Sequence, residues 1–480
     1  MSFDYTLLLP ELILTALALV VLVIDLSLAP GKKQSLTWIT FAGILVAMAG
    51  IWPATQTSAS QTLSGMVSSD GFSIFFKVLF LTVAALITLA SGPYLQQKRL
   101  PVGEFYILLL SATLGMMFMS GSRDLITIYL GLELASITSY ILAGLLREDP
   151  KSNEAAIKYF LNGAMASAVL LFGLSLVYGL TGETHLDIIG KVLNGDISHW
   201  PIVGVALVFL VAGFGFKMAA APFHLWTPDA YEGAPTLVTA FFAVGPKAGA
   251  MAAVLRAFTI GFAASSGRWT ELFAILAVVS MFFGNLTALW QTNVKRMMAY
   301  SSIAHIGYLL VGVTVATTVP GVASVMFYLL AYAVMTLGAF AVILAVDAFG
   351  PGDQVGNYAG LATRSPLLAW GLTLFFVSMI GIPPTGGFMG KFYLFSAAVQ
   401  NGYVWLAVVM AINSAISVGY YYGIVKEMFV GKPLETTSVK APAGVTAVVA
   451  ITMVVTLMLG LYASPFLNWA TAAAALPRFF

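Results

Sequence analysis

The sequence has no cysteine and very few charged residues. Cysteine is absent from all 480 residues, which excludes disulfides, thiolate zinc sites and iron–sulfur clusters held by this chain. Charged residues make up 9% of the chain, against about 25% in a typical soluble domain. The formal charge of +2 offers no basic surface for nucleic acid. The four histidines, at 185, 199, 224 and 305, lack the close spacing of a metal-binding motif.

Hydrophobic residues make up 60% of the chain and are gathered in runs of membrane-spanning length. A transmembrane barrel would instead show alternating segments of about ten residues. Residues 1–15, MSFDYTLLLPELILT, lack a basic stretch and a small-residue cleavage site, so they predict a retained first span and not a signal peptide. The composition therefore predicts an all-α polytopic membrane protein.

The apolar runs predict about fourteen transmembrane helices joined by short loops. The expected spans are 6–29, 35–54, 70–92, 103–120, 124–145, 154–180, 202–225, 236–260, 269–290, 297–317, 320–347, 367–399, 402–427 and 441–465. The longest polar connection is 181–200, and no segment has the composition of a soluble domain.

Basic residues in the loops predict the orientation, because cytoplasmic loops carry an excess of lysine and arginine. Twelve fall in odd-numbered connections: Lys32, Lys33, Lys98, Arg99, Arg147, Lys151, Lys295, Arg296, Arg364, Lys426, Lys432 and Lys440. Four fall on the other face: Arg123, Lys191, Arg268 and Arg478. In a bacterial inner membrane, both termini are therefore expected on the periplasmic side.

Charged residues within the spans are the strongest sign of function. A charge at mid-membrane costs about 2.5–3.5 kcal/mol even on a lenient insertion scale, and such residues usually pair and mark a transport path. The six basic residues within the spans are Lys77, Lys158, Lys217, Lys247, Arg256 and Lys391. Glu133 is the clearest acid at mid-span, and Glu11, Asp25, Glu154 and Asp347 stand nearer span ends.

Two segments combine a charge with helix-breaking residues. Residues 213–235, GFGFKMAAAPFHLWTPDAYEGAP, carry Lys217 five residues before Pro222. Residues 381–395, GIPPTGGFMGKFYLF, place prolines and glycines before Lys391. Proline removes a backbone donor and frees a carbonyl, so the seventh and twelfth helices are expected to be interrupted.

Similar spacings predict an internal repeat. Lys217 follows Glu133 by 84 residues, and Lys391 follows His305 by 86. Because five helices is an odd number, two five-helix copies would enter the membrane inverted, as in many transporters. The expected organisation is an N-terminal three-helix segment (1–100), a first repeat (101–268), a second, inverted repeat (269–430) and a C-terminal helix (431–480).

These residues suit proton transfer. Burial disfavours the charged form of a lysine and a neighbouring carboxylate favours it, so a change at the carboxylate changes the affinity of the lysine for a proton. Glu133 with Lys217 is the candidate coupling pair. Lys247 is the next proton-carrying site, here called a station, and Lys391 is the last. The titratable or water-ordering groups between them are His224 and His305.

Each candidate also has a structural reading. Glu133 and Lys217 would also fit a static ion pair between two helices. Lys158 lies one turn after Glu154 and would also fit a surface pair near a helix end.

The remaining intramembrane candidates have similar alternatives. Lys77 and Arg256 would fit acidic partners on neighbouring subunits or lipids. His224 would fit a helix cap, and His305 would fit a satisfied interior histidine.

Four motifs in order resemble the proton-conducting antiporter family. They are IYLGLELASITSYIL around Glu133, GFKMAAAPFHLWTPDAYEGAP around Lys217, QTNVKRMMAYSSIAHIGYLL around His305 and GIPPTGGFMGKFYLF around Lys391. The family contains the antiporter-like membrane subunits of respiratory complex I and the Mrp-type cation/proton antiporters. The similarity covers about residues 100–430.

The resemblance implies a fold and a set of roles. The fold is two inverted five-helix repeats with interrupted helices 7 and 12. Glu133 and Lys217 would form the coupling pair, Lys247 the central relay and Lys391 the connection to the opposite side. Lys158 and His224 match positions that the family treats as functional, and His305 falls where members often have a polar or basic group.

The resemblance also implies where the redox chemistry occurs. Such a subunit binds no cofactor, and NADH, FMN, iron–sulfur clusters and quinone belong to partner subunits. The expected partners are a paralogous antiporter-like subunit, small membrane subunits, lipids and protons. The chain would thus be a non-redox, proton-translocating subunit. Three rivals are a stand-alone Mrp-type antiporter, a structural spacer of the membrane arm and a transporter of a small anionic solute.

Overall fold

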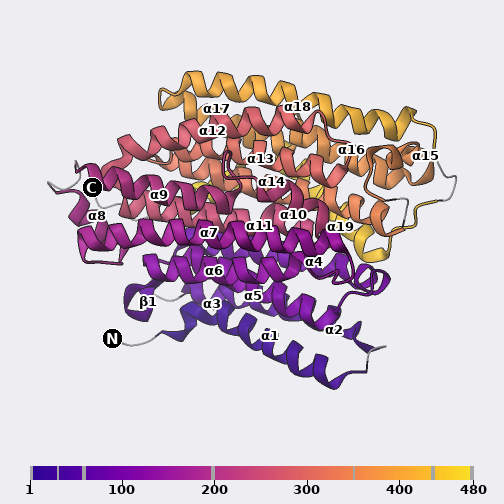
Figure 1. The fold of residues 1–480 in the computed structure, drawn as a ribbon, viewed down its shortest axis with the longest axis horizontal. Coiled ribbons are helices and arrows are strands. Elements are labelled where there is room, and N and C mark those ends of the chain that lie inside the picture. The colour runs from indigo at the N-terminus through magenta and orange to yellow at the C-terminus, as the bar shows by residue number, and fades with distance from the viewer. Residues whose placement is uncertain are drawn as a thin grey trace.

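The structure is a single bundle of helices lying side by side (Figure 1). The computed structural model describes residues 4–29, 32–56, 61–195, 200–349, 352–433 and 438–475. The N-terminal helices lie along one edge of the bundle, and the helices near residue 400 lie along the opposite edge (Figure 1). The prediction of an all-α polytopic membrane protein is therefore confirmed.

The elements follow one another with short connections. The α-helices are α1 (Leu9–Ser27), α2 (Ser35–Ala49), α3 (Ile51–Gln56), α4 (Gly71–Gln97), α5 (Val102–Gly121), α6 (Leu125–Ala143), α7 (Pro150–Thr181), α8 (Leu186–Leu193), α9 (Pro201–Met218), α10 (Trp226–Gly233), α11 (Thr236–Arg256), α12 (Ser266–Ala288), α13 (Val294–Thr314), α14 (Val319–Phe349), α15 (Leu361–Arg364), α16 (Pro366–Ile380), α17 (Gly386–Gln400), α18 (Val404–Val430), α19 (Ala443–Leu461) and α20 (Ser464–Ala473). The strands β1 (Gln61–Thr62) and β2 (Val67–Ser68) form an antiparallel pair.

Thirteen helices in the described part of the chain are long and apolar enough to cross a membrane. They match the expected spans except the twelfth, which is divided into the shorter helices α16 and α17. Four short helices that lie wholly or mostly outside the expected spans were not predicted: α8, α10, α15 and α20. Of the predicted features, His199 in the connection 181–200 and Arg478 lie outside the described residues.

Both expected interruptions are present, and each begins with a residue in the left-handed region. Helix α9 ends at Met218, Ala219 has φ 65°, and α10 begins at Trp226. Helix α16 ends at Ile380, followed by Gly381 at φ 91°. This conformation terminates an α-helix. Pro246 does not interrupt α11, which is continuous.

The helices in the middle of the bundle carry the central candidate residues. The spanning windows of α11, α13 and α14 are each 94% buried, whereas that of α1 is 39% buried. Helix α11 holds Lys247 and α13 holds His305. These groups therefore lie in the interior and do not reach lipid on their own.

Loops that were predicted to share one side do meet at one end of the bundle. Lys98, Lys151 and Lys295 come from three different connections and line one hollow of about 210 Å³. The start of α4 and the end of α20 meet each other, because the backbone of Gly71 lies against Ala473. The side of the membrane that each end faces remains a prediction from the loop charges.

The absence of cysteine allows this orientation to be tested with single introduced cysteines. Glu148 and Asn194 are both exposed and lie in connections predicted for opposite sides. A membrane-impermeant maleimide added to spheroplasts is expected to label Asn194→Cys and not Glu148→Cys, and inverted vesicles should give the reverse. The same labelling pattern in both preparations would contradict the predicted orientation.

Candidate functional site

Lys217 is bonded on several sides by groups from two neighbouring helices. Its Nζ donates to Ser136 Oγ and Ser167 Oγ, both at 2.9 Å, and to Tyr140 OH at 3.3 Å. Glu133 Oε1 lies 3.4 Å away and also accepts a hydrogen bond from Ser167 at 2.5 Å. The structure thus brings Glu133 and Lys217 together, with a serine that bonds to both.

Glu133 is the more accessible member of the pair. Its side chain is 21% exposed, against 7% for that of Lys217. It shares the outward face of α6 with the exposed side chains of Leu130 and Ile137. A neighbouring molecule that covers this face could therefore act on Glu133 while Lys217 stays inside.

The break after Lys217 has its backbone groups satisfied by side chains. Ala221 N donates to Ser280 Oγ of α12 at 2.9 Å. Trp226 Nε1 donates to the Phe216 carbonyl at 3.0 Å. A buried unpaired amide costs about as much as a lost hydrogen bond, so these side chains let the helix stop within the bundle.

Lys247 is buried in the middle of the bundle and bonds to a serine. Its Nζ donates to Ser302 Oγ of α13, which also receives a hydrogen bond from Tyr332 OH at 2.8 Å. The ammonium lies 5.0 Å from the centroid of the Tyr231 ring. Within the described residues, no carboxylate lies at ion-pair distance from Lys247.

His305 is bonded through both ring nitrogens. Nδ1 lies 2.5 Å from Tyr328 OH, and Nε2 lies 3.4 Å from Tyr421 OH. The Tyr332 ring, whose hydroxyl bonds to Ser302, packs on the imidazole with centroids 5.1 Å apart. His305 therefore lies next to the Lys247 group and is connected to it through Tyr332.

Lys391 reaches back across the second break. Its Nζ donates to the carbonyl of Ile380, the last residue of α16, at 3.0 Å and to Ser414 Oγ at 2.8 Å. The Tyr308 ring lies 4.3 Å from the ammonium. A hollow of about 260 Å³ between α17 and α18 is lined by Lys391 and Ser414, so this station lies beside an opening at the surface of the bundle.

Among the described residues, Lys217, Lys247 and Lys391 are not joined by one continuous chain of hydrogen bonds. Between Lys217 and Lys247 the contacts are aromatic: Tyr140 packs on Tyr159, which stacks on Trp226 at 4.1 Å. Proton transfer across this stretch would need water or side-chain movement. The sequence did not reveal these aromatic contacts.

His224 and Lys158 make no hydrogen bond to Lys217, Lys247 or Lys391 among the described residues. The His224 ring packs on the Phe283 ring, with centroids 4.3 Å apart. Lys158 is 45% exposed and pairs with Glu154 at 2.6 Å, as the surface reading expected, and also with Asp229 at 2.9 Å.

Asp229 connects Lys158 to a charged network at the end of the bundle. Its other oxygen accepts from Arg296 at 2.9 Å, and Arg296 also pairs with Glu232. Burial opposes ionisation of Asp229, but the bonds from Lys158 and Arg296 outweigh it and lower the pKa of this carboxyl. The network fixes the short helix α10 to α7 and α13.

The expectation of external partners for Lys77 and Arg256 is wrong. Lys77 pairs with Glu11 at 2.7 Å, and the side chains are 1% and 3% exposed. Arg256 donates to both oxygens of Asp70 at 2.7 Å. Both charges are therefore neutralised within the chain, because folding brings Glu11 to Lys77 across 66 residues of sequence and Asp70 to Arg256 across 186 residues.

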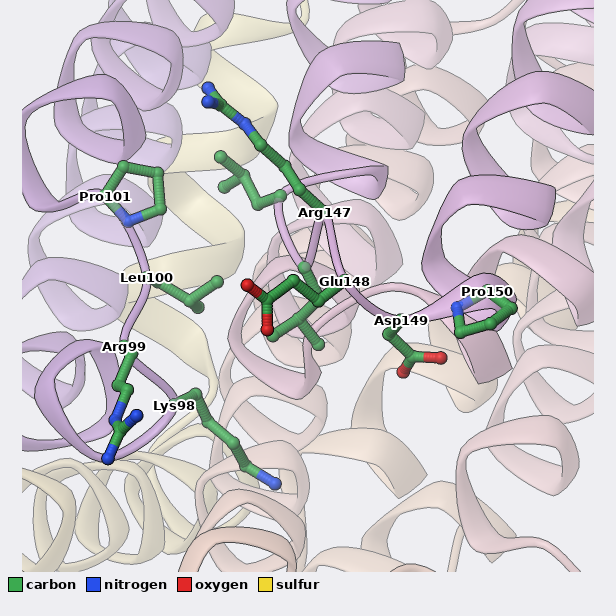
Figure 2. A pocket seen from close by; sticks show the side chains of 10 residues that line it. Lys98, Arg99, Leu100, Pro101, Arg147, Glu148, Asp149 and Pro150 are labelled. Carbon is green, nitrogen blue, oxygen red and sulfur yellow. The ribbon is translucent and has the colours of Figure 1, made fainter.

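A surface pocket of about 770 Å³ lies between residues 98–101 and 145–150, away from Lys217, Lys247 and Lys391 (Figure 2). Two of its cations are paired, Lys98 with Asp347 and Arg147 with Glu104. The hollow beside the first break is apolar and about 250 Å³ in volume, lined by Phe216, Pro222 and others. Neither has the form of a polar solute site at a helix break.

Sequence reasoning missed the uncharged members of the site. Ser136, Ser167, Ser302, Ser414 and Tyr308 contact the lysines directly. Serine and tyrosine are common in membrane helices, so only their helical spacing from Glu133 or His305 could have indicated some of them. No three His, Asp or Glu side chains in the described ranges come together as a metal site.

Comparison with known proteins gives a consistent result. A family model described as "NADH:quinone oxidoreductase/Mrp antiporter, TM" matches residues 122–417. "NADH-quinone oxidoreductase subunit N 2" of Symbiobacterium thermophilum is 51% identical over 98% of this chain and 97% of its own length. "NADH-quinone oxidoreductase subunit N" of Trichlorobacter lovleyi is 45% identical over 94% of this chain and 93% of its own length.

Solved structures show the same fold. A chain of respiratory complex I from Thermus thermophilus with bound aureothin is 33% identical, with a TM-score of 0.81, covering 96% of this chain and 99% of that one. A chain of the Mrp complex from Dietzia is 24% identical, with a TM-score of 0.83, covering 98% of this chain and 96% of that one, and shows the fold alone.

The first helix break yields a stability prediction. Ser280→Ala removes the acceptor of the buried Ala221 amide and is expected to destabilise the protein by about 1–3 kcal/mol. Ser280→Thr keeps the hydroxyl and should cost less. Thermal melting of the purified complex would measure both, with Ser175→Ala on the exposed face of α7 as the control. Equal melting of the two alanine variants would contradict a role for Ser280 at the break.

The buried pair of Lys77 with Glu11 gives a second stability prediction. Lys77→Met leaves the Glu11 carboxylate buried without a partner and is expected to cost about 3–5 kcal/mol. Adding Glu11→Gln should recover part of that loss. Lys33→Met, which breaks the more exposed pair with Asp25, should cost at most about 1 kcal/mol. If Lys77→Met and Lys33→Met lowered the melting temperature equally, burial of Glu11 without its partner would not cost the stability expected here.

Proposed function

Because the chain belongs to the NADH:quinone oxidoreductase/Mrp antiporter family, we propose that it is the proton-translocating, N-type membrane subunit of a complex I-type enzyme. The observation that carries this proposal is the contact of Glu133 with Lys217 and the two serines beside them. We call Lys217, Lys247 and Lys391 the lysine row. Lys247 and Lys391 lie in the interior without carboxylate partners among the described residues. Such groups can change protonation state when their surroundings change.

The first step is a change in the Glu133–Lys217 contact. While Glu133 is close, the ammonium of Lys217 is favoured, and when the carboxylate moves away or is neutralised the proton is released. The exposure of Glu133 on the outward face of α6 allows a neighbouring subunit to cause this change. Redox chemistry elsewhere in the complex would supply the free energy, and this chain would contribute no redox group of its own.

The proton then passes to Lys247 and on toward Lys391. Water or movement of Tyr159 and Trp226 would bridge the first gap. On the side of the second half, Lys247 bonds to Ser302, which is connected through Tyr332 to His305. Lys391 exchanges its proton with the opposite side through the hollow beside Ser414. Lys158 and His224 would act around the uptake half, Lys158 through Asp229 and His224 beside the first break.

The two halves would correspond to two inverted five-helix copies, 101–268 and 269–430. Supporting this, the first two helices of each copy pack together, α5 with α6 and α12 with α13. The third helix of each copy packs on the interrupted fourth, α7 on α9 and α14 on α16 and α17.

The proposed setting is the inner membrane, with both termini on the periplasmic side. The partners would be a paralogous antiporter-like subunit and the small membrane subunits of the membrane arm, with lipids around them. NADH, FMN, iron–sulfur clusters and quinone would be held by other subunits. A stand-alone Mrp-type antiporter is the second candidate, since the matched family includes that class. It would exchange cations for protons without an electron donor.

Substitutions in the assembled complex test the proposal. Lys217→Ala and, separately, Glu133→Ala are expected to slow NADH-driven proton translocation in membrane vesicles at least about tenfold. Lys426→Ala, an exposed lysine at the end of α18, serves as the matched control. The amount of assembled complex is measured by NADH oxidation with an artificial electron acceptor.

The outcome separates the candidates. Full translocation by assembled Lys217→Ala and Glu133→Ala complexes would overturn the proposed roles. Loss of assembly with normal translocation by the remaining complex would favour a structural spacer. Cation-dependent proton exchange by the chain without NADH would favour the Mrp-type antiporter.

A further inference from the structure

Each of the three relay lysines lies near the ring of a tyrosine. The distance from Nζ to the ring centroid is 5.9 Å for Lys217 and Tyr140, 5.0 Å for Lys247 and Tyr231, and 4.3 Å for Lys391 and Tyr308. An ammonium within about 6 Å of an aromatic ring is attracted by the negative ring face, and more strongly when both are removed from water. The same kind of contact thus occurs at each of the three lysines.

The tyrosine is closest where a counter-charge is missing. Lys217 has Glu133 at 3.4 Å and the most distant ring. Lys391 has no acid at ion-pair distance in the part of the chain that the structure describes, and it has the nearest ring. Its remaining partners, the Ile380 carbonyl and Ser414 Oγ, are uncharged.

Tyr308 is held in place by its hydroxyl. Asn285 Nδ2 of α12 donates to Tyr308 OH at 3.1 Å. Asn285 is itself fixed from α18, by Asn413 Oδ1 at 3.1 Å and by Tyr420 OH, which donates to Asn285 Oδ1 at 3.0 Å. All four side chains are buried. The hydroxyl is therefore occupied by a buried network, and the Lys391 ammonium lies over the ring.

We propose that Tyr308 is a positioning residue that replaces a carboxylate at the Lys391 station, and that Tyr231 has the same role at Lys247. This inference rests on the proposed proton-relay function. A carboxylate can take the proton itself and can hold the ammonium in a tight ion pair. A ring face favours the charged lysine without accepting its proton, so the proton stays free to leave. Such a partner suits stations that only pass protons on.

The test varies the charge of the ring face at constant shape in the assembled complex. Tyr308→Phe keeps the ring and removes the anchoring hydroxyl, so it should retain proton translocation and serves as the reference for the other ring variants. Incorporation of 3,4,5-trifluorophenylalanine at position 308 keeps a ring of nearly the same size but withdraws charge from its face. It is expected to slow NADH-driven proton translocation about tenfold relative to Tyr308→Phe, which corresponds to about 1.4 kcal/mol. Tyr308→Leu, which removes the ring, should lose at least as much.

Three comparisons decide between the possible outcomes. Equal rates for the phenylalanine and trifluorophenylalanine complexes would overturn the role of the ring face. Full loss in the Tyr308→Phe complex would place the function in the hydroxyl and overturn it too. Lys391→Ala is measured in parallel: if it translocates normally, the Lys391 station of the proposed function fails. If Lys391→Ala is impaired while the fluorinated ring has no effect, only the present inference fails.

Discussion

The arrangement of this molecule depends on keeping ammonium groups inside an apolar bundle. A buried charge is tolerated only when polar groups replace the water that it has lost. Lys217 meets this requirement with serines, a tyrosine and Glu133. Lys247 and Lys391 meet it with a serine hydroxyl and a tyrosine ring, to which Lys391 adds a backbone carbonyl. The partners become less charged along the row, which is consistent with a pair that controls proton release followed by groups that pass the proton on.

The two helix breaks also help to stabilise the buried ammonium groups. Unpaired carbonyls at the C-terminal end of a helix carry partial negative charge. Lys217 lies in the last turn of α9, and Lys391 bonds to the last carbonyl of α16. In the sequence the lysine precedes one break and follows the other. In space each lysine is associated with the C-terminal end of the half-helix that precedes its break, because the Lys391 side chain reaches back across the second break. The reversed order therefore does not make the two stations electrostatically different.

Other buried charged side chains have full ion-pair partners, and these pairs stabilise the fold. Lys77 pairs with Glu11 within the N-terminal segment, and Arg256 of α11 pairs with Asp70 and so joins that segment to the rest of the bundle. Burial opposes ionisation of Asp70, but Arg256 outweighs it and holds the pKa of that carboxyl well below its usual range. The relay lysines differ from these pairs because their partners are movable or uncharged. The completeness of pairing, and not burial alone, separates the two groups.

The amino-acid pattern predicted the membrane class, the approximate spans and both helix interruptions, and it singled out the intramembrane charges as candidates. It could do so because hydrophobic runs, prolines and intramembrane charges act locally along the chain. Only the tertiary structure decided which acid faces Lys77, which ring faces Lys391 and which serine satisfies the Ala221 amide. These contacts join helices that are distant in sequence. Their partners are residues common throughout the chain, so helix packing alone selects one tyrosine or serine among many.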